Sequence, residues 1–72
     1  MKKIDLSQEK IGTVFYTRNY LEAKLIERIA NDLYRFEVDS FGDIQIRIYS
    51  KSGNIIQADM RKSHPLNLRE KA

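Results

Sequence analysis

Hydrophobic and polar residues alternate along three runs in the second half of the chain. The runs cover residues 34–39, 43–49 and 54–60. A period of two places successive side chains on opposite faces of a β-strand. The alternation therefore predicts a three-stranded antiparallel meander with one buried face and one solvated face.

The register of this meander follows from the requirement that the apolar residues of neighbouring strands share a face. In the first hairpin, the predicted pairs are Val38 with Ile44, Phe36 with Ile46 and Tyr34 with Ile48. In the second hairpin, they are Ile48 with Ile56, Ile46 with Ala58, Ile44 with Met60 and, on the other face, Tyr49 with Ile55. Both registers leave three-residue loops, 40–42 and 51–53, each ending in the glycine that such a loop favours.

A change of period before the meander predicts the main helix, over about residues 19–33. Asn19 and Glu22 have the spacing of a capping box at its start. One helical face then carries the apolar residues Leu21, Leu25, Ile26, Ile29, Ala30 and Leu33. Packing this face on the apolar side of the meander predicts a two-layer α+β domain.

Residues 11–17 fit two structures. Their β-branched and aromatic composition favours a strand that joins the sheet. Ile11, Val14 and Phe15 also continue the helical stripe, so a single helix from Ser7 to Leu33 remains an alternative. That helix would hold a glycine and two threonines in its interior, and we therefore favour the strand.

Composition places the chain among small non-enzymatic proteins of the cytoplasm. We expect residues 1–60 to form one α+β domain and residues 61–72 a frayed basic tail. There is no cysteine, and no apolar run approaches the length of a membrane helix. The 13 Lys and Arg residues and the 10 Asp and Glu residues are interspersed, which favours solubility more than binding to a polyanion.

The residue types that catalysis needs do not form a recognisable set. The only histidine, His64, lies in the predicted tail without an acidic partner, and we expect it to be solvent-exposed. Three isolated glycines form no phosphate-binding loop. We therefore expect that the chain is not an enzyme and that it binds no cofactor or metal ion.

Protein binding is the leading functional hypothesis. The predicted fold leaves Tyr49 and Ile55 uncovered on the outer sheet face, beside Arg47, and leaves Phe41 at a hairpin tip. Exposed Tyr and Arg side chains are common at the centres of protein interfaces. We therefore expect a regulatory or inhibitory module, of a size common among phage and mobile-element proteins, which contacts another protein through these residues.

Two alternatives remain open. A nucleic-acid-binding accessory protein would use the basic residues of the tail, the second turn and the outer face. These residues are Arg35, Arg47, Lys51, Arg61, Lys62, Arg69 and Lys71. The third hypothesis is a homodimer with a structural role, joined through its sheet edges.

Overall fold

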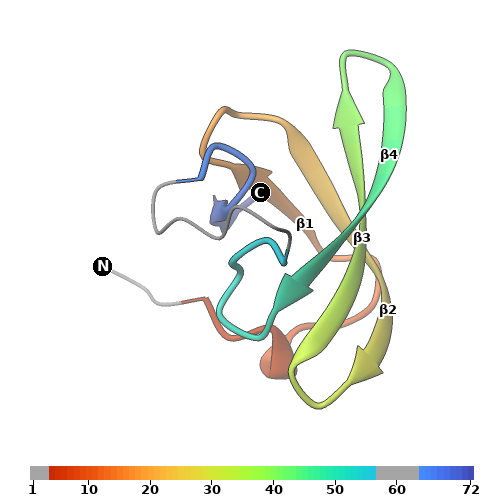
Figure 1. The fold of residues 1–72 in the computed structure, drawn as a ribbon, viewed down its shortest axis with the longest axis vertical. Coiled ribbons are helices and arrows are strands. Elements are labelled where there is room, and N and C mark those ends of the chain that lie inside the picture. Colours follow the sequence, from red (N-terminus) through yellow and green to blue (C-terminus); the bar gives the residue numbers. More distant parts are fainter. Residues whose placement is uncertain (1–3, 57–63) are drawn as a thin grey trace.

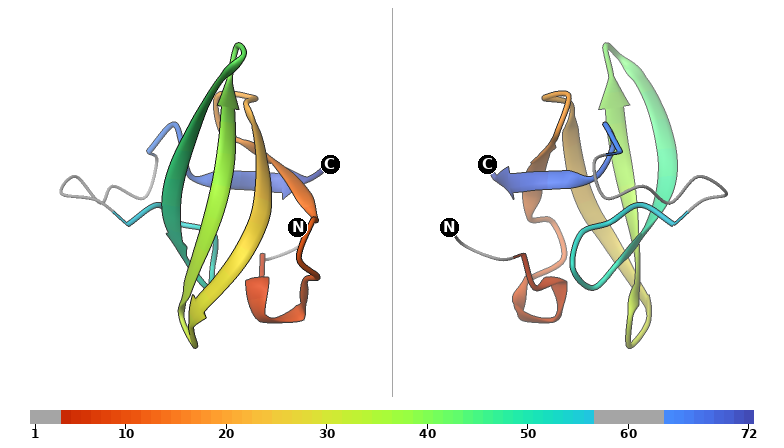
Figure 2. Two further views of the ribbon diagram at one scale, coloured as in Figure 1. Left: turned by 90° about the vertical axis from the view of Figure 1, so that its right-hand side faces the viewer. Right: turned by 60° about the vertical axis from the view of Figure 1, so that its left-hand side comes forward.

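The computed structural model describes residues 4–56 and 64–72, and these form a single five-stranded antiparallel sheet. The elements, in chain order, are the 3-10 turn η1 (Leu6–Gln8) and the strands β1 (Val14–Thr17), β2 (Glu22–Ala30), β3 (Leu33–Ser40), β4 (Asp43–Ser50) and β5 (Leu68–Lys71). The spatial order is β4-β3-β2-β1-β5, so the last strand returns to pair with the first. Figure 1 shows the long β3–β4 hairpin projecting beyond the rest of the chain. In the left view of Figure 2, β5 crosses behind the twisted layer of the other strands.

The α+β prediction is wrong, because the segment expected to form the main helix is the strand β2. β2 pairs with β1 on one side and with β3 on the other. Ala23 and Leu25 are buried at alternate positions, whereas Ile29, which belongs to the predicted helical face, is 42% exposed. Asn19 caps no helix, since its side chain accepts a hydrogen bond from the Thr17 hydroxyl in the β1–β2 turn.

The strand favoured within residues 11–17 is present as β1, but it runs antiparallel to both of its neighbours. The 3-10 turn η1 precedes it, and the side chain of Asp5 caps this turn by accepting a hydrogen bond from the Ser7 backbone N–H at 3.1 Å. The Ser7 hydroxyl donates a second hydrogen bond to the same carboxylate at 2.6 Å. These bonds to its charged form lower the pKa of Asp5, and the Ser7 side chain is the main cause.

The first hairpin is shifted by one residue from its predicted register. Ser40 pairs with Asp43, which leaves a two-residue loop in place of the predicted loop 40–42. The loop residues Phe41 and Gly42 have φ values of 54° and 92°, as a type I′ turn requires. The Asp39 carboxylate accepts a hydrogen bond from the Gly42 N–H at 2.7 Å. A shift of one residue moves every side chain of β4 to the opposite face.

The three isoleucines of β4 consequently lie on the outer face. They pair with Asp39, Glu37 and Arg35, and not with the apolar residues of β3. The inner face of β4 carries Gln45, Arg47 and Tyr49, which lie opposite Val38, Phe36 and Tyr34.

The second hairpin keeps its predicted register where it is described. Tyr49 pairs with Ile55, and Ser50 donates to Asn54 across the loop 51–53, where Gly53 has a φ of 87°. The predicted pairings of Ala58 and Met60, and the rest of the run 54–60, lie outside the described residues.

The end of the chain belongs to the sheet, in contrast to the frayed tail that the sequence predicts. β5 pairs with β1, and the Leu68 N–H donates to the Gly53 carbonyl at 2.8 Å. The Asn67 side chain accepts a hydrogen bond from the Ile55 N–H at 2.8 Å. Residues 64–72 therefore connect the second hairpin to the first strand.

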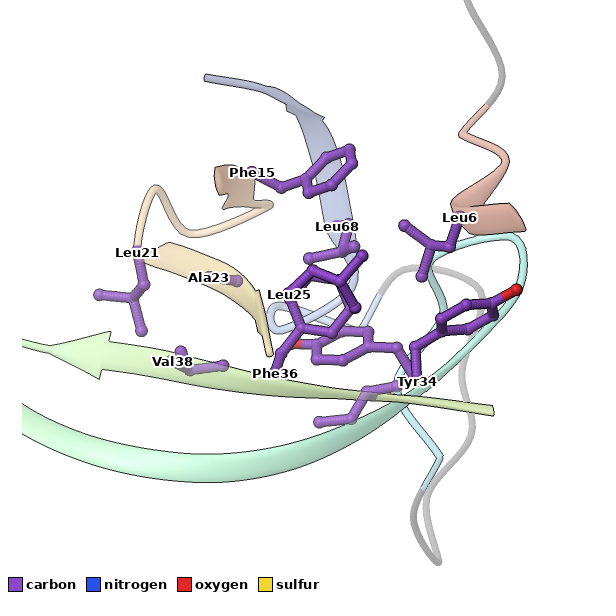
Figure 3. Close-up of a cluster of buried hydrophobic side chains, with 11 residues drawn as sticks. Leu6, Phe15, Leu21, Ala23, Leu25, Tyr34, Phe36, Val38 and Leu68 are labelled. Carbon is purple, nitrogen blue, oxygen red and sulfur yellow. The ribbon is translucent and has the colours of Figure 1, made fainter. Parts of the chain in front are cut away.

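The core lies on the concave side of the sheet, where aromatic rings pack at its centre (Figure 3). The Phe36 ring lies 6.0 Å from that of Phe15 and 4.9 Å from that of Tyr49, both in edge-to-face geometry. Leu6 of η1 and Leu68 of β5 also belong to this cluster. The described residues include no helix with the length and hydrophobicity of a membrane span.

Candidate functional site

Tyr49 and Ile55 are core residues, so their predicted exposure on the outer face is wrong. Their side chains are 0% and 1% exposed. The Tyr49 hydroxyl donates to the Leu66 carbonyl at 2.6 Å, which ties β4 to the segment before β5. Neither residue is therefore accessible to a partner in this fold.

β4 is an edge strand of the sheet that the described residues form. Beyond Ile48, this edge pairs with the chain itself, because the Ile48 carbonyl accepts from the Ile56 N–H and Ser50 donates to Asn54, both at 2.8 Å. Backbone groups alternate in direction along a strand, so those of Ile44 and Ile46 point to the same edge. Residues 4–56 and 64–72 provide no strand that pairs with Ile44 or Ile46 there.

Exposed apolar side chains accompany this open edge. Ile44 and Ile46 are 54% and 50% exposed, and Phe41 at the hairpin tip is 95% exposed. Phe41 also holds a positive φ, which is uncommon for an aromatic residue. Open backbone groups and apolar side chains together make the stretch a template for strand addition.

The inner side of the same stretch carries a row of polar side chains. The Gln45 amide donates to Asp43 at 3.4 Å, and the Arg47 guanidinium donates to the Gln45 side chain. The Nε of Arg47 is buried, and no group in the described part of the chain hydrogen-bonds to it. None of the ion pairs among the described residues involves Asp43 or Arg47. Among the described residues, this part of β4 therefore carries one acid, Asp43, and one base, Arg47, that form no ion pair.

Three of the five described basic residues considered for nucleic-acid binding are paired with acids. Arg35 pairs with Glu27 on the outer face. Lys71 of β5 lies 3.0 Å from Glu9. Arg69 pairs with Glu70 and stacks on Tyr20, with its Cζ 4.9 Å from the ring centre.

Lys51 and Arg47 are the other two basic candidates within the described residues. Lys51 is exposed in the loop of the second hairpin, and Arg47 lies on the inner face of β4. Arg61 and Lys62 lie outside the described residues.

The predicted exposure of His64 is wrong, since its side chain is only 7% exposed. Its Nδ1 accepts a hydrogen bond from the Leu66 N–H at 3.1 Å, which shapes the turn before β5. Within the described ranges, no three His, Asp or Glu residues lie close enough to hold a metal ion.

Phe41 and Arg47 of the predicted binding surface lie beside the outer edge of β4, whereas Ile44 and Ile46 were expected to be buried. The signal that could have located them is the Phe41-Gly42 pair, because a two-residue turn centred there places the isoleucines on the outer face.

Comparison with known proteins adds no assignment. The chain matches no protein-family model, and no curated protein or solved structure is similar to it.

Proposed function

We propose that this chain is a non-enzymatic binding module that regulates or inhibits another protein chain by accepting a strand of it on the outer edge of β4. Main-chain hydrogen bonds to Ile44 and Ile46 supply the affinity in this mode of recognition. The isoleucine side chains and Phe41 supply the apolar contacts.

The observation that carries this proposal is the coincidence of open backbone groups and exposed isoleucines on one edge. An exposed apolar edge strand is a liability that soluble proteins usually blunt with lysine, proline or a covering segment. The exposed positions of β4 carry two isoleucines that are about half exposed. An apolar edge of this kind is explained most directly by a partner that covers it.

Nucleic-acid binding has less support as a function of the same fold. Phosphate contacts require free cations that lie together on one surface. Arg35, Lys71 and Arg69 each have an acidic partner, and Asp39 and Glu37 lie beside the isoleucines on the outer face.

A retention experiment tests the proposal. The immobilised chain, the variant Ile46→Lys and the matched control Ile11→Lys are compared for proteins retained from a lysate of the organism that encodes the chain. Ile11 is 59% exposed and lies outside the strands, so both variants place lysine at an exposed isoleucine. We expect Ile46→Lys to weaken retention about tenfold or more, because it removes an apolar contact and places a charge at the interface.

The control decides how the result is interpreted. Ile11→Lys should retain the partner like the unaltered chain. Equal retention by Ile46→Lys would contradict the proposal. Fluorescence anisotropy with DNA and RNA at about 50 and about 200 mM salt gives the counter-test, since tight binding that weakens steeply with salt would favour nucleic acid.

A further inference from the structure

We infer that the strand accepted by the β4 edge is β4 of a second copy of this chain, in an antiparallel pairing about a two-fold axis through Gln45. This inference rests on the proposed function and names its partner. Two features of the edge lead to it, the length of the uncovered stretch and the order of its charges.

The uncovered stretch determines the register of such a pairing. Within residues 4–56 and 64–72, it begins at Asp43, after the turn, and ends before Ile48, whose carbonyl accepts a hydrogen bond from the Ile56 N–H. An antiparallel pair centred on the middle of this stretch aligns Gln45 with Gln45 of the second copy. Ile44 of each copy then lies opposite Ile46 of the other, and the two residues exchange both backbone hydrogen bonds.

The neighbouring registers do not fit this edge. A pairing centred on Ile46 would need the Ile48 carbonyl, which already accepts a hydrogen bond from Ile56. A pairing centred on Ile44 would draw the turn residue Gly42 into the ladder, although its φ of 92° is not that of a strand. Only the register centred on Gln45 uses the whole open stretch.

The charges of the edge are complementary in that same register. Asp43 of each copy lies opposite Arg47 of the other, in a non-hydrogen-bonded pair whose side chains come close together. Within a single copy neither of these residues takes part in an ion pair among the described residues. The Nε of Arg47 is buried without a hydrogen bond there. Self-pairing gives the Asp43 carboxylate and the Arg47 guanidinium a partner of opposite charge.

The isoleucine side chains of the two copies also contact each other in this arrangement. Because side chains directly opposite share a face, Ile44 and Ile46 of both copies meet on the outer side of the joined sheets. β-Branched residues pack well in such cross-strand pairs. A ladder of this length buries less surface than a standard protein interface, so we expect a dissociation constant on the order of 10–500 μM.

Sedimentation equilibrium over about 5 μM to 1 mM tests the pairing through a charge exchange. The average mass of the unaltered chain should rise with concentration from the monomer mass of 8.5 kDa towards twice that mass. In a dimer of the Asp43→Lys variant, the new lysine of each copy lies opposite Arg47 of the other. In a dimer of the Arg47→Glu variant, the new glutamate lies opposite Asp43. Like charges then meet in both dimers, so each variant alone should raise the dissociation constant about tenfold or more. An equimolar mixture should recover the dimer, because each mixed pair again joins opposite charges.

Three results would overturn the inference. They are a monomer at 1 mM, a dimer of Asp43→Lys as strong as that of the unaltered chain, and a mixture that associates no better than its components. Asp43 is exposed, so Asp43→Lys remains informative if Arg47→Glu does not fold. A chain that stays monomeric and loses its retained protein on Ile46→Lys would contradict self-pairing but support the proposed function. If Ile46→Lys changes neither the average mass in sedimentation nor the retention of a partner, the self-pairing and the proposed function are both wrong.

Discussion

Tyr49 shows how one side chain joins the strands around the core. Its ring packs against Phe36, and its hydroxyl reaches the Leu66 carbonyl. Burial raises the pKa of Tyr49 above the ordinary value of 10.0, while the nearby Arg47 lowers it by a smaller amount. The folded state therefore favours the neutral phenol.

This pKa shift predicts that alkali destabilises the fold. Below pH 10 the phenol is neutral in both states and its stabilising contribution is complete. As the pH rises above the unfolded pKa, the unfolded chain loses the Tyr49 proton while the folded chain retains it, so stability falls by about 1.4 kcal/mol per pH unit until the folded pKa is reached. Urea unfolding at pH 7 to 11.5 measures this slope.

Tyr49→Phe isolates the contribution of the hydroxyl. The variant should lose about 1 kcal/mol at pH 7, because the Leu66 carbonyl loses its hydrogen bond. The decrease in the free energy of unfolding between pH 10 and 11.5 should also be less steep in this variant, by the contribution of about one proton. Tyr16→Phe, on a partly exposed residue of β1, is the control for removing a tyrosine hydroxyl. An alkaline slope in Tyr49→Phe as steep as in the unaltered chain would show that Tyr49 is not its source.

At the scale of the element, the sequence predicts the positions of β3 and β4 well and the nature of β2 wrongly. Leu21, Leu25 and Ile29 satisfy a helical spacing, and the residues between them have high helix propensity. In the fold, β2 is an inner strand with hydrogen-bonded neighbours on both edges. This tertiary pairing outweighs local propensity, and β5, which pairs with β1 beyond it, is only four residues long.

The face of β4 was mispredicted for a different reason. Its alternation is equally regular in either register, and matching isoleucines to the apolar face of β3 is the ordinary choice. The turn overrides that choice, because Phe41 and Gly42 both adopt positive φ and close the hairpin in two residues. The same shift buries Tyr49 and exposes Ile44 and Ile46, so the error in register also explains why the predicted exposure of Tyr49 is wrong.

The hairpin tip offers a test in which stability and binding change in opposite directions. Asn-Gly is a preferred type I′ pair, whereas phenylalanine pays a steric penalty at the φ of 54° that Phe41 adopts. We expect Phe41→Asn to stabilise the fold by about 0.5–1 kcal/mol in urea unfolding. The same variant should weaken partner retention, because the exposed ring is removed.

Phe41→Ala separates these effects. It also removes the ring but has no preference for positive φ, so it should weaken binding as Phe41→Asn does without the same gain in stability. Unchanged retention by both variants would remove Phe41 from the binding surface.

At the scale of the whole molecule, the chain joins its ends to make one core from a small number of residues. β5 pairs with β1, while Leu66, Asn67 and Leu68 hold the second hairpin against them. This closure leaves the N-terminal half of the β4 edge unpaired within the described residues. A chain of 72 residues has a thin core, so a partner on that edge would add substantially to its stability.

Residue-resolved amide hydrogen exchange of β4 by NMR tests the open edge most directly. At about 20 μM, the amides of Gln45 and Arg47, which face β3, should be protected, whereas those of Ile44 and Ile46 should exchange rapidly. At about 1 mM, protection of Ile44 and Ile46 should rise as the edge becomes paired. Strong protection of Ile44 and Ile46 in the dilute sample, or protection without alternation along β4, would contradict an open binding edge.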